Sequence, residues 1–165
     1  NMDGTDYCLV TSNSEKAEVA AVSYERSSIF SQIKDGSQPR KLYVVVPHLD
    51  ADSVPVPNVV TAGAGSVVGR PTIAACVRDP VESQQRELYS LGSKEPVYEN
   101  GNYRLNFYGR VSHPSVKNFQ IVSVDDPDDI ICQFGKVGDD KFHLDFKAPI
   151  SPFQAFGIAL TQFNI

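Results

Sequence analysis

The segment from 151 to 165 constrains the fold more than any other part of this chain. Its first residues, Ser151-Pro152-Phe153-Gln154, combine a serine N-cap, a proline at the first helical position and a glutamine three residues after the cap, which together predict a helix start. Apolar residues then surround nearly the whole helix, and a helix of this kind has to be enclosed. Its length of about 21 Å, from about 14 residues at 1.5 Å each, is too short for a bilayer core.

We therefore expect this helix to be threaded through the rest of the protein. The large side chains expected to contact strands on every side are Phe153, Phe156, Ile158, Leu160 and Phe163.

Short runs of β-branched and aromatic residues between turn signals make up most of the remaining chain, a pattern typical of a sandwich or barrel. Strands are predicted over 7–11, 18–25, 41–48, 72–77, 86–91, 103–107, 116–124, 130–137 and 141–146. The last two form the clearest hairpin, and Phe142, Leu144 and Phe146 should face the core. The predicted fold is mainly β, an antiparallel closed β-barrel wrapped around a hydrophobic C-terminal central α-helix.

Composition narrows the class of protein. A chain of 165 residues with 41% hydrophobic and 21% charged residues suits one globular domain, and its net charge of −5 argues against a general nucleic-acid binder. The sequence has no apolar run long enough for a transmembrane helix. Cys8, Cys76 and Cys132 lie in apolar runs, which predicts buried free thiols in a reducing cytosol. Residues 49–71, rich in Pro, Gly and Asp, are predicted to form a long variable loop.

Two segments resemble the signatures of the Tubby family. Residues 105–120 (LNFYGRVSHPSVKNFQ) are similar to its first signature, and residues 155–163 (AFGIALTQF) to its second. Between them, 126–128 (DPD) and 133–137 (QFGKV) match in order and spacing, and 18–25 and 39–47 also resemble the family upstream. The departures from the family pattern at Tyr108, Pro114 and Gln162 identify a divergent member.

This resemblance implies a non-enzymatic module that needs no cofactor and binds phosphoinositides at membranes. The implied location is cytoplasmic and peripheral, at the inner face of the plasma membrane, with the nucleus or cilium as further locations, and protein cargo is an implied partner. The family's lysine and arginine ligands lie on strands before the position of Asn1. Residues 1–165 are therefore expected to be a single domain that lacks its first strands, and the resemblance assigns no lipid-binding residue to this chain.

Two other functions are compatible with the resemblance or the fold. One is a nuclear transcription regulator that contacts DNA, which the net charge opposes. The other is a barrel that binds another small ligand or a protein partner.

The charged and nucleophilic residues favour structural interpretations over chemical ones. Arg110 and Lys117 would serve as phosphate ligands or as partners of backbone or carboxylate groups at a strand turn, and the second interpretation is favoured. The run Asp125-Asp126-Pro127-Asp128-Asp129 lacks the alternation of a calcium loop and indicates a solvated turn. The stretch 63–69 has glycines but lacks the Lys-Ser or Lys-Thr of a phosphate-binding loop.

The histidines do not form a recognisable catalytic motif. His48, His113 and His143 lie near predicted strands, without a Gly-x-Ser-x-Gly nucleophile elbow, and His143 should face solvent. The sequence therefore predicts no catalytic residue and no metal ligand.

Overall fold

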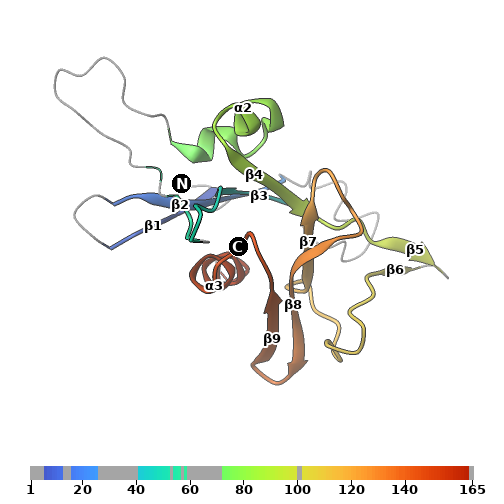
Figure 1. Ribbon diagram of the computed structural model, residues 1–165. Helices are drawn as coiled ribbons and strands as arrows, with labels where there is room; N and C mark the ends of the chain where they lie inside the picture. Colours follow the sequence, from blue (N-terminus) through green and yellow to red (C-terminus); the bar gives the residue numbers. More distant parts are fainter. Residues whose placement is uncertain are drawn as a thin grey trace, which may run out of the picture.

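A seven-stranded antiparallel sheet forms the frame of the protein (Figure 1). The computed structural model describes residues 6–12, 16–25, 41–52, 54–56, 58, 72–99 and 102–163. The strand order is β1-β2-β3-β4-β7-β8-β9. The bounds are β1 (Asp6–Val10), β2 (Glu18–Tyr24), β3 (Leu42–Pro47), β4 (Leu88–Ser93), β7 (Phe119–Ser123), β8 (Ile130–Gly138) and β9 (Lys141–Phe146). A separate two-stranded hairpin joins β5 (Val97–Glu99) to β6 (Asn102–Arg104).

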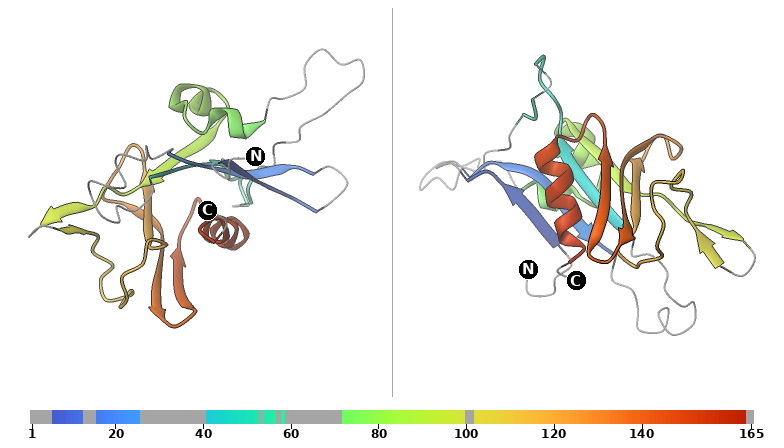
Figure 2. Two further views of the ribbon diagram at one scale, coloured as in Figure 1. Left: turned by 180° about the vertical axis from the view of Figure 1, so that it is seen from behind. Right: turned by 90° about the horizontal axis from the view of Figure 1, so that it is seen from below.

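The sheet curls around the C-terminal helix α3 (Pro152–Thr161). Strands β1 to β3 lie on one side of α3 and β8 and β9 on another, so the helix occupies the concave side of the sheet (Figures 1 and 2). The helix packs against β1, β2 and β9. The prediction of a mainly β, antiparallel barrel-like fold around this helix is confirmed, and the described strands form half of such a barrel with β1 and β9 at its edges.

Both faces of the central strands are covered, which is why every residue of β2 is buried. On the concave side, Val22 and Val44 join Ile158 of α3 in the main hydrophobic cluster. On the other side, Ala21 and Val45 pack with Ile73 and Cys76 of the 3₁₀ helix η1 (Ile73–Cys76), and the helix α2 (Pro80–Gln85) contacts β4 and η1. Continuous apolar runs such as that of β2 are expected where a sheet is covered on both faces.

The strand predicted over 72–77 is wrong, because this segment forms the 3₁₀ helix η1. The helix α2 that follows was missed, although its start carries signals like those at Ser151. The Asp79 side chain accepts a hydrogen bond from the Glu82 N–H, and Pro80 occupies the first turn. The segment is apolar and contains β-branched residues, as a strand would. It forms a helical turn instead because the turn packs on the outer face of β2 and β3.

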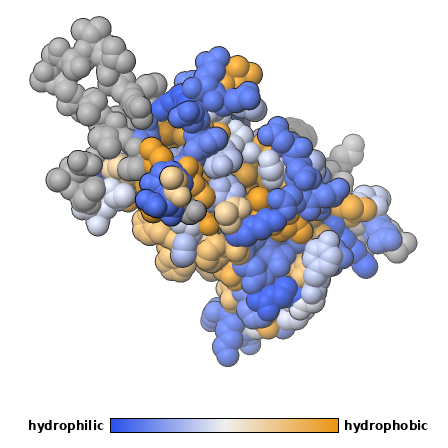
Figure 3. Space-filling model, in the orientation of Figure 1, coloured by the Kyte–Doolittle hydropathy of each residue, from blue (hydrophilic) through white to orange (hydrophobic). Residues whose placement is uncertain are grey.

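The start of α3 is as predicted, but its enclosure is not. The Ser151 side chain accepts from the Gln154 N–H, and the Gln154 side chain accepts from the Ser151 N–H at 2.8 Å. Ile158 is fully buried. The other four large side chains are exposed, Phe153 by 57%, Phe156 by 58%, Leu160 by 50% and Phe163 by 49%. The described strands contact the helix through β1, β2 and β9 and leave its opposite face uncovered, and apolar surface is visible over α3 in Figure 3.

Two further expectations fail at the edge strands. Cys76 and Cys132 are buried free thiols as predicted, but Cys8 is exposed because it lies on edge strand β1. In β9, Phe142 and Leu144 pack against the core, whereas Phe146 is 41% exposed at the other edge. The hairpin between β8 and β9 forms as predicted.

Part of the predicted loop over 49–71 lies within the described residues. The Asp50 side chain accepts hydrogen bonds from the N–H groups of Asp52 and Val54, and Leu49 bridges to Pro55. Asn58 then pairs with Glu18 of β2 through both backbone groups. Residues 53, 57 and 59–71, including the glycine-containing stretch 63–69, lie outside the described residues.

Candidate functional site

Residues 105–118, here called the signature loop, are fixed to β8 by backbone hydrogen bonds. The N–H groups of Ser112 and His113 both donate to the Lys136 carbonyl, at 3.2 and 3.1 Å. The Asn118 side chain accepts from the Lys136 N–H at 2.9 Å and donates to the His113 carbonyl. Because Asn118 forms hydrogen bonds with both β8 and the loop, it links the loop to the sheet.

Close packing of Val111 on the sheet requires a glycine at position 135. A Cβ added to Gly135 would lie 2.2 Å from a methyl carbon of Val111, well inside the van der Waals limit. The Gly in the segment 133–137 and the Val in the first signature therefore meet as a complementary pair.

A row of polar side chains links the signature loop to three strands. Arg110 donates two hydrogen bonds to the Asp145 carboxylate, at 2.9 and 2.7 Å. Gln133 donates to the same carboxylate, and Gln120 donates to both Gln133 and the Asn106 carbonyl. The Arg110 guanidinium, helped by Gln133, lowers the pKa of Asp145 to about 2.

The side chain of Lys117, from the signature loop, caps the C-terminal end of helix α3. Its ammonium group donates to the Gln162 carbonyl at 2.9 Å and lies 4.8 Å from the centre of the Phe163 ring. A cation at a helix C-terminus satisfies a free carbonyl and interacts favourably with the helix dipole. Arg110 and Lys117 thus make the carboxylate and backbone contacts that the sequence interpretation favours.

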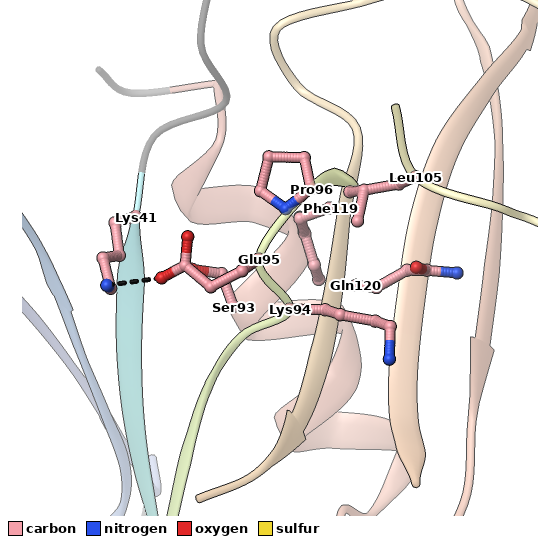
Figure 4. A pocket seen from close by; sticks show the side chains of 8 residues that line it. All are labelled: Lys41, Ser93, Lys94, Glu95, Pro96, Leu105, Phe119 and Gln120. Carbon is pink, nitrogen blue, oxygen red and sulfur yellow. Dashed lines mark ion pairs between the residues drawn. The ribbon is translucent and has the colours of Figure 1, made fainter. Parts of the chain in front are cut away.

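A second pair of cations borders a small pocket of about 30 Å³ (Figure 4). Lys41 forms an ion pair with Glu95, whereas the Lys94 side chain turns away from this pair. Lys94 donates to the Pro127 carbonyl and to the Asp128 carboxylate. The pocket has room for a water molecule, and acidic partners already hold both lysines, so it does not suit a phosphate group.

A larger hollow lies beside the signature loop. This groove, here called the signature groove, has a volume of about 840 Å³ and is bordered by Arg104 of β6 and by the loop. Its apolar lining comprises Pro96, Leu105, Phe107, Val111, Pro114 and Val116. Sequence analysis missed it, because no local pattern shows that the chain before β5 approaches the loop after β6.

The buried carboxylate of Glu18 was also missed by sequence analysis. It accepts hydrogen bonds from the Thr72 hydroxyl at 2.5 Å, the Ile73 N–H at 2.8 Å and the Asn58 amide at 3.0 Å. Burial raises the pKa of Glu18, but these hydrogen bonds outweigh burial and hold its pKa below the ordinary value. The carboxylate therefore joins both ends of the segment 58–72 to β2.

The acidic run 125–129 and the histidines, the remaining candidates from the sequence, contact neighbouring protein groups. In the acidic run, Asp126 accepts from the Asp128 N–H, and Lys147 pairs with Asp129. His48 stacks on Tyr89 and His143 contacts the Arg110 carbonyl. Within the described ranges, no three His, Cys, Asp or Glu side chains are grouped as metal ligands. No helix in the same ranges is long and apolar enough to cross a membrane.

The fold and these contacts define a class, a mainly β domain in which an antiparallel sheet curls around a C-terminal helix. The model of the Tub family matches residues 3–165, so the chain belongs to this family.

Three relatives illustrate the match. The chain is 38% identical to Tubby-related protein 1 of Mus musculus over 151 residues, which are 90% of this chain and 25% of the relative. It is 36% identical to Tubby-related protein 3 of Homo sapiens over 158 residues, 94% of this chain and 33% of the relative. It is 35% identical to Tubby protein homolog 1 of Caenorhabditis elegans over 162 residues, 90% of this chain and 33% of the relative. The chain thus spans a quarter to a third of the length of these relatives.

Proposed function

We propose that the full-length protein is a non-enzymatic adaptor that binds phosphoinositides and attaches peripherally to the inner face of the plasma membrane. The observation that carries this proposal is membership of the Tub family over nearly the whole chain. Protein cargo or a signalling partner completes the proposed role.

The head-group ligands are proposed to lie on strands before Asn1. The engagement of four of the described cations supports this placement. Arg110 is held by Asp145, Lys117 by the Gln162 carbonyl, Lys41 by Glu95 and Lys94 by Asp128. Binding a phosphate would require breaking charge-assisted hydrogen bonds that already exist.

Vesicle sedimentation tests the proposal. Full-length protein should sediment with phosphatidylcholine vesicles that contain a phosphoinositide and stay in solution with phosphatidylcholine alone. Residues 1–165 alone should bind both kinds weakly or not at all. Micromolar binding of phosphoinositide vesicles by residues 1–165 would place the ligands within this chain, and failure of the full-length protein to bind would refute the function.

Binding of double-stranded DNA by the full-length protein tests the alternative function, a transcription regulator. Preferential binding of the full-length protein to DNA over phosphoinositide vesicles would favour the transcription regulator instead.

We further propose that upstream strands of the same domain cover the outer face of α3. Three large apolar side chains, Phe153, Phe156 and Leu160, are half or more exposed on this face, and it lies between the edge strands β1 and β9. Among the described strands each edge strand has a single neighbouring strand, so a further strand can be added beside each. Added strands would pair with these edges and bury the helix.

A further inference from the structure

The signature groove has the dimensions and lining of a binding site. Its volume of about 840 Å³ lies within the range of about 300 to 1,000 Å³ typical of ligand sites. Val116 is 61% exposed at its border, and Leu105 and Phe107 are half-buried in its lining. Apolar side chains gathered in a concave surface favour an apolar occupant, because its burial releases their hydration water.

The loop side of the groove is fixed to the sheet by several contacts. Hydrogen bonds from Ser112 and His113 to β8, the Asn118 bridge and the packing of Val111 on Gly135 all fix this side to the sheet. A preformed site loses less conformational entropy on binding than a loop that has to become ordered.

The positive charge of the groove favours a partner that carries carboxylates. Arg104 and His113 are the ionisable residues among those that line it, and Arg104 is exposed with no ion-pair partner among the described residues. The chain as a whole has a net charge of −5, so a cationic lining is a local departure from its surface. An occupant with carboxylates would be attracted here and repelled from most of the molecule.

The neighbouring hairpin favours an extended occupant. Among the described strands β6 pairs only with β5, so a further strand can be added beside β6, whose Arg104 lines the groove. Extended segments bind such edges by adding a strand, while their alternate side chains enter adjacent pockets.

We propose that the signature groove binds an extended segment of a partner protein in which acidic residues alternate with apolar ones. The apolar side chains contact the lining around Val116, and a carboxylate pairs with Arg104. This site is separate from the lipid-binding function proposed above, and its test does not depend on that function.

Fluorescence anisotropy with the full-length protein tests the proposal. The probe is a fluorescein-labelled hexapeptide of alternating glutamate and valine, and matched peptides replace glutamate by lysine or by serine. The glutamate peptide should bind saturably and at least tenfold more tightly than the lysine peptide, with the serine peptide between them.

Paired variants locate the binding. Arg104→Glu and Val116→Asp should each weaken the glutamate peptide at least tenfold. Lys141→Glu makes the same change of charge in β9, and Val124→Asp the same change at an exposed valine outside the lining, so both should stay within twofold of wild type. Arg104→Gln removes the charge with little change in size and should weaken binding in the same direction even if Arg104→Glu fails to fold.

Three results would overturn the proposal. They are the absence of saturable binding, equal affinity for the glutamate and lysine peptides, and equal losses in the groove variants and their controls. Displacement of the bound peptide by phosphatidylserine vesicles, with the vesicles losing affinity for Val116→Asp, would assign the groove to lipid and overturn it as well.

Discussion

Asp145 is one of the residues at which the signature loop contacts the sheet. It lies on β9, accepts two hydrogen bonds from Arg110 and one from Gln133, and so joins a motif cation to an edge strand. An arginine bound in this two-point geometry is held in orientation as well as in place. The conspicuous arginine of the first signature is therefore explained by the fold, without a ligand.

Acid should weaken this junction. The pKa of Asp145 is lowered from 3.8 to about 2 in the folded protein, so the folded state holds fewer protons than the unfolded state between these values. The stabilisation is present above about pH 4 and is lost as pH falls toward 2. Asp145→Asn should unfold more easily than wild type at pH 7, and the difference should shrink between pH 4 and pH 2, as measured by urea denaturation.

Asp139→Asn provides the matched control, because Asp139 is exposed in the turn between β8 and β9. It should match wild type across this range. A stability difference between Asp145→Asn and wild type that stays constant from pH 7 to pH 2 would contradict the assignment.

At the scale of elements, helix α3 has two unequal faces. Its inner face is held by polar anchors as well as by packing. Gln154 donates to the Val19 carbonyl at 2.7 Å, and Thr161 and Gln162 both bond the Tyr24 hydroxyl. Gly157 allows close approach, since an added Cβ would lie 1.9 Å from a Leu9 methyl carbon. On the outer face Phe153, Phe156 and Leu160 are half or more exposed, while Phe163, just beyond the helix, packs edge-on against Phe134 and Phe142.

Truncation at two neighbouring helix positions should separate these faces. Ile158→Ala should lower the free energy of unfolding of residues 1–165 by about 2 to 5 kcal/mol, because it leaves a cavity in the main cluster. Phe156→Ala should cost about 1 kcal/mol or less, as expected near the surface. Urea denaturation measures both, and equal losses would mean that the outer face is already covered in this chain.

The elements that sequence analysis predicted well are those with local signals. The capping residues at 151–154 define where α3 starts, and the turn residues at 138–140 define the β8–β9 hairpin. The segment 72–77 was misassigned because an apolar β-branched run is compatible with a strand or a helical turn, and tertiary contacts decide.

The candidate site was less predictable than the fold. The signatures located the loop and its cations, but the pairing of Gln120 with Gln133 depends on strand register. The signature groove depends on where distant segments meet, which no local pattern records.

At the scale of the whole molecule, the open side of the half-barrel exposes apolar side chains to solvent, which is energetically unfavourable. The outer face of α3 presents Phe153, Phe156 and Leu160 to solvent, between edge strands that each have a single neighbour among the described strands. Concentrated apolar surface on a monomer usually marks an interaction site. Upstream strands of the same domain would satisfy the apolar face and both strand edges together.

Phe156→Asp distinguishes a covered face from an exposed one when it is made in two chain lengths. In residues 1–165 the new carboxylate would remain hydrated, so the melting temperature should change little. In the full-length protein the proposed strands would bury it without a partner, which typically costs several kcal/mol against a total stability of about 5 to 15 kcal/mol. The full-length variant should therefore melt far below its wild type or fail to fold.

Hydrogen exchange supplies the second measurement, which needs no mutation. The outward amides of β1 and β9 should exchange slowly in the full-length protein and faster in residues 1–165, because pairing protects edge amides. Leu91 and Gly92 of the central strand β4, each paired with both β3 and β7, should be protected in both and serve as the internal control. If β1 and β9 exchange at equal rates in the two proteins, and Phe156→Asp is tolerated in both, the outer face of α3 remains open in the full-length molecule and the covering strands do not exist.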